Sequence, residues 1–174
     1  MSPAVIGLDL SLRATGMAVV TAIGRHAETI RRPQYIGTER LRSIRDAIVH
    51  RVEGIRPALV VIENYSFGSR NSQAHSLGEL GGVVRLALDD IGARWIALPP
   101  SSLKKYATGR GTADKALVLT EAVRRLGYAG SSTDEADALW LACAGHALLG
   151  HSVVDVPKTH AVALDGIDIN KGEA

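Results

Sequence analysis

The sequence predicts a mixed α/β domain in which helices cover both faces of a five-stranded sheet. Two observations indicate this fold class. Segments with alternating or continuous β-branched residues, typical of strands, come first as a group of three and then singly. Segments with apolar residues every three or four positions, typical of helices, separate the later strands. A chain of 174 residues is long enough to bury the core of one such domain.

The first three strands follow one another without a helix between them. Residues 4–10 form an apolar run that contains a carboxylate, Asp9, and a short polar turn leads to a second apolar run at 14–22. The two runs predict a hairpin at the centre of the sheet. A third extended segment is expected over 26–36, and its Pro33 indicates an edge strand or a bulge because proline has no N–H to donate to a ladder.

An amphipathic helix comes next, with Thr38 as its expected N-cap. It ends near Gly54 and Pro57. A near-continuous β-branched run at 58–63 then predicts a strand buried on both faces. This strand also ends in a carboxylate, Glu63. The apolar positions of the helix recur at helical spacing and are Leu41, Ile44, Ile48, Val52 and Ile55.

A second long helix is expected over 73–91, followed by a short fifth strand at 94–98. The helix contains Gly78, Gly81 and Gly82, each of which costs about 1 kcal/mol relative to alanine in a helix. We attribute these glycines to the close approach of another backbone or of a ligand.

Further helices complete the predicted domain. Thr112 is the expected cap of the second of them, and Ser132 with Glu135 has the spacing of a capping box at the start of the last. We expect one domain over 1–150 and a polar tail over 151–174 that is partly disordered or lies on the surface. The expected helix ranges are 100–106, 113–126 and 133–149.

The composition excludes some classes of protein. No apolar run approaches the roughly 20 residues that span a bilayer, and the N-terminus lacks the layout of a signal peptide. The single cysteine, Cys143, cannot form an intramolecular disulfide, which suits the cytoplasm. The net charge is only +2, but basic residues gather between 104 and 125. This patch is either a contact surface for a polyanion or a solvated helix face.

Four carboxylates lie at the ends of core elements: Asp9, Glu63, Asp134 and Asp137. A buried carboxylate such as Asp9 costs several kcal/mol unless something compensates it. Adjacent strands would bring Asp9 and Glu63 together, and the two aspartates share a face of the last helix. Such an all-oxygen site suits Mg²⁺ or Mn²⁺, and two such ions cleave phosphodiesters. Each acid alone also has a structural explanation, and the capping box accounts for Glu135.

These stretches resemble the RuvC-type Holliday junction resolvases of the ribonuclease H-like superfamily, with order and spacing that agree over about residues 4–150. The resemblance implies a ribonuclease H-like fold. It also implies a homodimer, joined through the helix at about 73–91, that binds four-way DNA junctions. The enzyme would nick two opposed strands with two Mg²⁺ ions per site, Mn²⁺ being a substitute. A phage-borne protein, acting in the host cytoplasm, would also fit. The matching stretches are Gly7–Gly16, Val60–Glu63, Lys104–Lys115 and Asp134–Leu139.

The resemblance also implies roles for single residues. It makes Asp9, Glu63, Asp134 and Asp137 the catalytic metal ligands. The family's base-stacking aromatic follows the second acid, at a position where this chain has Ser66 between two aromatics. A loop anchored by its aromatics is the alternative for those two residues. The expected DNA-binding residues are Lys104, Lys105, Arg110, Lys115, Tyr65, Phe67 and Arg70.

Three other functions compete with this interpretation. One is a ribonuclease H-like nuclease for flaps, forks or RNA. Another is an ATP-binding module of the actin and sugar-kinase type, which begins with a similar Gly-x-Asp-x-Ser hairpin. That fold needs two such domains, and this chain has one such hairpin. The third is a catalytically idle DNA-binding module, which the acids disfavour. The resolvase interpretation places the turn from Ser11 to Gly16 near the scissile phosphate.

Overall fold

The computed structural model describes residues 3–64 and 72–170, and its centre is a five-stranded sheet in the order β3-β2-β1-β4-β5. Strand β1 pairs antiparallel with β2 and parallel with β4, while β2–β3 is antiparallel and β4–β5 parallel. The fold class expected from the sequence is confirmed. The strands are β1 (Val5–Asp9), β2 (Thr15–Val20), β3 (Arg25–Ile30), β4 (Leu59–Glu63) and β5 (Trp95–Leu98).

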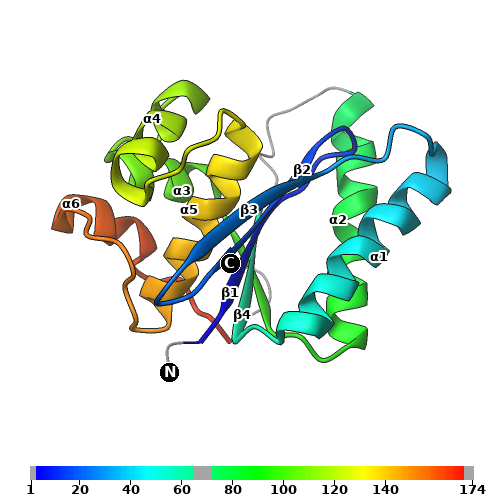
Figure 1. Ribbon diagram of the computed structural model, residues 1–174, viewed down its shortest axis with the longest axis horizontal. Helices are drawn as coiled ribbons and strands as arrows, with labels where there is room; N and C mark the ends of the chain where they lie inside the picture. Colours follow the sequence, from blue (N-terminus) through cyan, green and yellow to red (C-terminus); the bar gives the residue numbers. More distant parts are fainter. Residues whose placement is uncertain (1–2, 65–71, 171–174) are drawn as a thin grey trace.

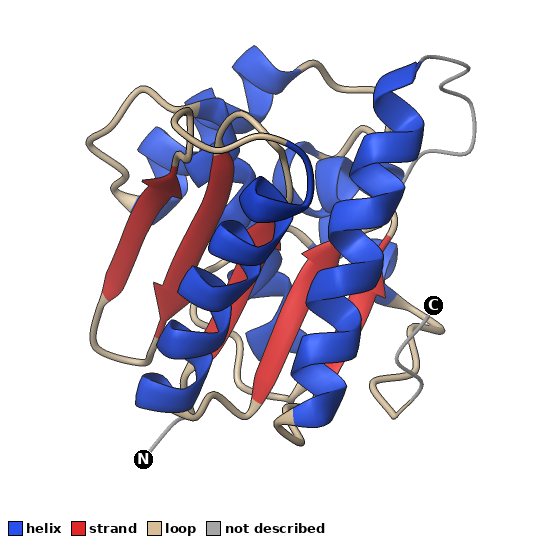
Figure 2. Cartoon of the chain, turned by 90° about the vertical axis from the view of Figure 1, so that its right-hand side faces the viewer, coloured by secondary structure: helices blue, strands red, loops and turns tan. Residues whose placement is uncertain are grey.

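Helices cover both faces of the sheet (Figure 1). Helices α1 and α2 lie side by side on one face, as the turned view also shows (Figure 2). Helices α3, α4 and α5 cover the other face. In the described part of the chain, no helix is both long and apolar enough to cross a membrane. The helices are α1 (Gly37–Ile55), α2 (Ser72–Asp90), α3 (Pro100–Thr108), α4 (Lys115–Leu126), α5 (Thr133–Leu148), α6 (Lys158–Ala161) and the 3₁₀ turn η1 (Val162–Leu164).

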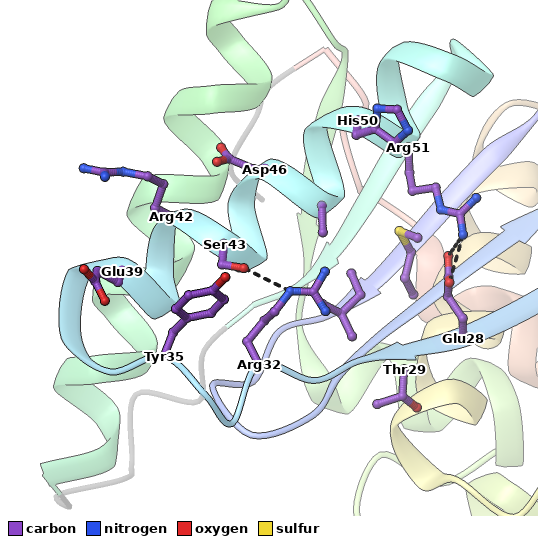
Figure 3. Close-up of a pocket in the computed structure, with 13 residues that line it drawn as sticks. Glu28, Thr29, Arg32, Tyr35, Glu39, Arg42, Ser43, Asp46, His50 and Arg51 are labelled. Carbon is purple, nitrogen blue, oxygen red and sulfur yellow. Dashed lines mark hydrogen bonds and ion pairs between the residues drawn. The ribbon is translucent and has the colours of Figure 1, made fainter.

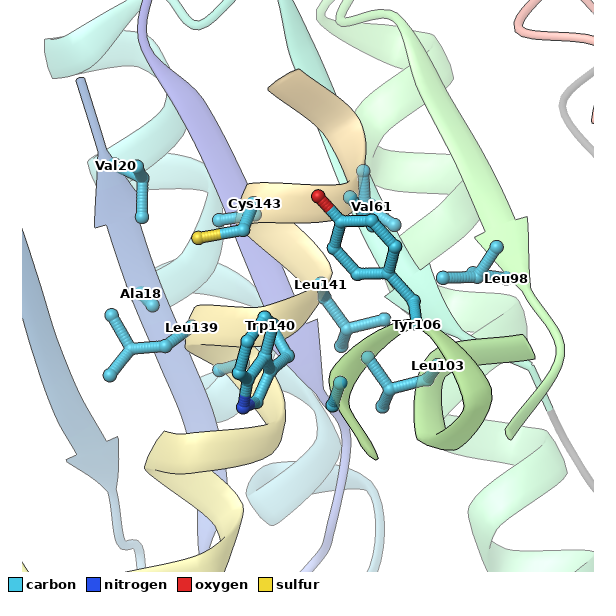
Figure 4. Packing of buried hydrophobic residues seen from close by; sticks show 14 of the residues in the cluster. Ala18, Val20, Val61, Leu98, Leu103, Tyr106, Leu139, Trp140, Leu141 and Cys143 are labelled. Carbon is cyan, nitrogen blue, oxygen red and sulfur yellow. The ribbon is translucent and has the colours of Figure 1, made fainter. Parts of the chain in front are cut away.

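The alternation of side chains along the strands creates two separate cores. In β1, Ile6 and Leu8 point to the face under α1 and α2, whereas Val5 points to the face under α5. The core on the α5 side is built around Tyr106 and Trp140, whose rings meet edge to face with centroids 5.9 Å apart (Figure 4). Each face of the sheet therefore has its own hydrophobic core.

Helix α5 lies directly on β1 and β2 because glycines face it from both strands. A Cβ on Gly7 would overlap the carbonyl oxygen of Ala138, and a Cβ on Gly16 would overlap the carbonyl of Asp134. No side chain therefore fits between strand and helix at these two points. This close approach sets the N-terminal turn of α5 over the ends of β1 and β2.

Three local expectations are wrong. Strand β3 ends at Ile30, and Pro33 lies in the turn that follows, where the N–H of Tyr35 donates to the carbonyl of Arg32. That turn brings the chain to α1 early. The N-cap is therefore Ile36, without a side-chain hydrogen bond, and Thr38 is already inside the helix.

The cap of α4 also differs. Asp114 is the N-cap, and its carboxylate accepts from the N–H of Leu117 at 2.8 Å. Thr112 lies earlier, in a turn where the N–H of Ala113 donates to the carbonyl of Arg110. A charged carboxylate at the positive end of a helix is a stronger cap than a distant hydroxyl.

Candidate active site

Two of the expected site residues meet at the carboxyl edge of the sheet. Asp9 ends β1 and Glu63 ends β4, and the parallel register pairs Leu8 with Ile62 one step before them. Side chains alternate between the two faces of a strand, so Asp9 points toward α5 as Val5 does. The same alternation in β4 points Glu63 toward α5. The side chains of Asp9 and Glu63 are close enough that each influences the pKa of the other. Asp9 is only 7% exposed.

The other two acids come from the first turn of α5. Ser132 caps this helix, and its hydroxyl accepts from the N–H of Glu135 at 3.3 Å. Asp134 and Asp137 lie on the face of α5 that is turned toward β1 and β2, and the close contact at Gly16 holds this face near the strands. Asp137 is 4% exposed, whereas Asp134 is partly open to solvent. The structure therefore brings the four sequence-predicted acids into one cluster.

Lys115 lies among these acids. Its ammonium is 3.7 Å from Oδ2 of Asp9, 3.4 Å from Oδ1 of Asp134 and 3.4 Å from Oδ2 of Asp137. The side chain begins at the first residue of α4, which the Asp114 cap holds in place. It is about half exposed, so it reaches the cluster from the solvent side. The cation that compensates the buried Asp9 in this structure is thus a lysine of the chain itself.

The acids influence one another strongly. Burial, reinforced by Glu63, raises the pKa of Asp9 to about 8 although Lys115 opposes the shift. Burial and the charge of Asp137 raise the pKa of Glu63 to about 7. The pKa of Asp137 is also raised, mainly by burial. Burial alone would lower the pKa of Lys115, but the carboxylates of Asp9 and Asp137 raise it above its usual value. One ammonium therefore compensates the cluster only in part.

The donor set of this cluster fits hard divalent cations. Carboxylate oxygens are the ligands that Mg²⁺ and Mn²⁺ prefer, and the acids of the cluster outnumber the single ammonium of Lys115 that lies among them. As the side chains stand, no group of three or more acidic, histidine or cysteine residues in the described ranges has the spacing to hold a metal ion. The ammonium of Lys115 separates the carboxylates instead. Metal binding would therefore require Lys115 and the acids to rearrange locally.

We expect the metal-free protein to lose stability as the pH rises from about 4 to about 8. Between these values the folded protein, with raised pKa values at Asp9 and Glu63, binds more protons than the unfolded chain. Stability is then greatest below the unfolded pKa and declines as these acids ionise. The measurement is the melting temperature in EDTA across this range, with Asp9→Asn for comparison. A decline that is as steep in Asp9→Asn as in the wild type would contradict the prediction.

Glu135 has a different role from its neighbours. Its carboxylate accepts the hydroxyl of Thr29 in β3 at 2.5 Å and the hydroxyl of Tyr128 at 2.6 Å. The N–H of Ser132 donates to the same tyrosine oxygen at 3.3 Å. The capping box is thus half formed: Ser132 caps the helix, but Glu135 does not reach back to it. The acid instead fastens the start of α5 to β3, a role that sequence spacing does not reveal.

The structure places only some of the expected DNA-binding residues near the acids. Lys104 on α3 is close enough to lower the pKa of Glu63 and of Asp137, after the larger effects of burial and of other charges. Lys105 is the next residue of α3, and Arg110 is exposed in the turn beyond it. The remaining three fall outside the described residues and stay predictions: Tyr65, Phe67 and Arg70.

A separate hollow of about 840 Å³ lies between β3 and α1, on the face of the sheet opposite the acids (Figure 3). Arg51 forms an ion pair with Glu28 across it at 2.9 Å, and Arg32 donates to the hydroxyl of Ser43 at 3.0 Å. Its three arginines are matched by three acids, so it has no net attraction for an anion. The charged residues that line it are Glu28, Arg32, Glu39, Arg42, Asp46 and Arg51.

The sheet order and an acid cluster at its carboxyl edge define a ribonuclease H-like nuclease. The model of the family described as crossover junction endodeoxyribonuclease RuvC matches residues 5–146. The chain belongs to this RuvC family, whose members are metal-dependent nucleases.

Individual relatives agree with this assignment. The RuvC of Mycobacterium ulcerans is 32% identical over 168 residues, which cover 91% of each chain. The solved structure of Thermus thermophilus RuvC is 27% identical with a TM-score of 0.71, covering 87% of this chain and 99% of that one. A second structure, T. thermophilus RuvC in complex with a Holliday junction substrate, is 25% identical with a TM-score of 0.69 and covers 88% and 99% of the two chains.

Proposed function

We propose that this protein binds four-way DNA junctions as a homodimer and nicks two opposed strands by metal-dependent phosphodiester hydrolysis. The observation that supports this most directly is the cluster of four acids at the carboxyl edge of the sheet, compensated only in part by Lys115. A site with this excess of carboxylates has a strong electrostatic reason to take up divalent cations.

Asp9, Glu63, Asp134 and Asp137 would hold the metal, which we propose to be two Mg²⁺ ions, with Mn²⁺ as a substitute. When bound, such ions activate a water molecule and stabilise the leaving oxygen of the phosphodiester. Asp9 and Asp137 are the two most enclosed of these acids, at 7% and 4% exposed, and they come from the strand and the helix side of the cluster. Because bound metal would neutralise the acids in place of Lys115, the ammonium of this lysine would turn toward the phosphate.

The DNA would run over the surface formed by α3, the turn after it and the start of α4. Lys104 and Lys115 flank the acids, and Arg110 extends the positive charge along this edge. Lysine and arginine contacts to phosphates supply affinity without sequence information. Such recognition suits an enzyme that reads the shape of a branch. Lys105 is proposed as a further DNA contact, as are Tyr65, Phe67 and Arg70, which fall outside the described residues.

A four-way junction is favoured over other branches because a relative of similar fold has been solved with a Holliday junction substrate. The test is a panel of labelled four-way junctions, flaps, forks and duplexes, each with and without Mg²⁺. We expect paired nicks near the branch point of four-way junctions, only with the metal, and at least about tenfold slower cutting of the other substrates. Faster cutting of flaps or forks would identify a general branched-DNA nuclease instead.

We place the dimer contact on the outer face of α2. Gly78, Gly82 and Leu86 follow one another at intervals of four, on one stripe of this helix. Leu86 is 63% exposed, and a Cβ on Gly78 or Gly82 would meet no atom within 4 Å. Gly81, in contrast, is buried. Two exposed glycines beside an exposed leucine allow a second helix to approach closely.

Gly82→Arg is therefore expected to weaken dimerisation by at least about tenfold, since an arginine would separate the two helices at their closest point. Sedimentation velocity over a concentration series measures this. Gly54→Arg is the matched control, because Gly54 is also a helical glycine with open space around its Cα. A Gly82→Arg protein that dimerises as tightly as Gly54→Arg would place the interface elsewhere.

A further inference from the structure

We infer that the C-terminal segment, residues 151–170, is a strap that positions the proposed DNA-binding edge, and that His160 is the positioning residue within it. The inference rests on the proposed function, because it concerns the grip of α3 and the following turn on DNA. This segment follows the residues matched by the family model, which end at 146.

The strap packs against α3. Helix α6 and η1 both contact that helix. Leu164 is 8% exposed and belongs to the same core cluster as Leu103 and Tyr106 of α3. Figure 1 shows α6 on the α5 side of the sheet, where it contacts α3. The helix that carries Lys104 is thus held between the sheet core and the strap.

His160 completes the C-terminus of α3. Its Nδ1 lies 3.2 Å from the carbonyl oxygen of Tyr106, a geometry in which a protonated Nδ1 donates to that oxygen. The helix itself does not provide this bond, because the N–H of Arg110 donates to the hydroxyl of Thr108. The imidazole also covers Gly109, where φ is +81° and a Cβ would be 2.7 Å from Nε2. His160 therefore satisfies a helix-terminal carbonyl and closes over the cap residue.

The contacted turn is continuous with the basic residues of the site. The hydroxyl of Thr108 donates to the carbonyl of Lys104 at 2.7 Å and accepts from the N–H of Arg110 at 3.2 Å. One hydroxyl thus joins the backbones of the two residues proposed to hold phosphates. The carbonyl that His160 contacts lies between them in the chain. Loss of the His160 contact should allow the side chains of Lys104 and Arg110 to vary in direction, without removing either charge.

The strap does not depend on His160 for its path. Arg25 donates to the carbonyl of Val153 at 2.6 Å, and Arg125 donates to that of Asp155 at 3.1 Å. Near its far end, Arg94 donates to Oδ1 of Asn170 at 2.8 Å. A substitution at His160 alone should therefore leave the segment in place. This allows the positioning effect to be measured in a folded, full-length protein.

The experiment compares His160→Ala with His160→Asn, whose amide keeps a donor for the Tyr106 carbonyl. Thr159→Ala is the control, since Thr159 is the exposed neighbour. Junction affinity is measured over a salt series without divalent metal, and KM and kcat are measured with Mg²⁺. We expect His160→Ala to raise Kd and KM about fivefold, to change kcat less than about twofold and to reduce the salt slope by about one phosphate contact. His160→Asn should restore most of the affinity.

Each alternative outcome has a distinct meaning. If the wild type does not nick four-way junctions, the proposed function is overturned. If the wild type nicks them and His160→Ala has unchanged Kd, KM and salt slope, only the strap inference is overturned. If His160→Ala and His160→Asn are equally weak and both melt well below the wild type, His160 supports stability alone, which also overturns the inference.

Discussion

Replacing Asp9 by asparagine is expected to abolish nicking of four-way junctions while leaving junction binding intact. Asparagine has the same shape but lacks the charge that would attract a divalent cation. Loss of several kcal/mol of transition-state stabilisation corresponds to at least about 10³-fold in rate. Binding depends on lysines and arginines outside the cluster and should be retained. The measurements are nicking with Mg²⁺ and gel-shift affinity without it.

The melting temperature of Asp9→Asn shows whether a loss of nicking is caused by misfolding. Because burial raises the pKa of Asp9 to about 8, removing this acid relieves the folded metal-free protein of an unfavourable charge at that pH. Asp9→Asn should therefore melt no lower than the wild type in EDTA at pH 8. Asp165→Asn is the matched control, since Asp165 is exposed and lies on the strap. Nicking by Asp9→Asn at the rate of Asp165→Asn would refute the assigned role.

The second large effect is expected from Lys115→Ala. The substitution removes the ammonium that lies within 4 Å of three carboxylates, so the acids of the metal-free protein would lose their main compensation. We expect a lower melting temperature in EDTA near pH 8, partly restored by Mg²⁺. Junction binding should weaken for every sequence, and the slope of log K against log salt should fall by about 0.9.

Lys104→Ala tests the same surface with less effect on stability. Lys104 acts on Glu63 and Asp137 less strongly than Lys115 does. Its loss should reduce the salt slope by a similar amount and change the melting temperature little. Lys158→Ala, at an exposed position on α6, is the control. A salt slope that stays at the wild-type value in both Lys104→Ala and Lys115→Ala would exclude a phosphate-binding role for these lysines.

Much of the fold could be predicted because its signals are local. The continuous β-branched run before Glu63 and the helical spacing from Ile44 to Val52 identify strand and helix without knowledge of their partners. The prediction that Ser132 caps α5 is confirmed, because the accepting hydroxyl and the N–H of Glu135 that donates to it lie within four residues of each other. The caps at Thr38 and Thr112 were wrong because the preceding turns, not the residue types, set where those helices begin.

Local patterns in the amino-acid sequence are enough to predict the order of strands and helices along the chain, the family resemblance and the unusual position of Asp9 and Glu63 at the ends of apolar strands. Which charged side chains contact one another follows from the packing of the folded chain and could not be predicted. Lys115 is 106 positions from Asp9 and Thr29 is 106 from Glu135, yet each pair is in contact. Such contacts depend on how α5 packs on the sheet and how α4 packs on α5, and α5 lies close to the sheet because Gly7 and Gly16 have no side chain. The physical reason is that local periodicity reports the burial of an element, whereas the partner of a buried charge is set by packing between distant elements.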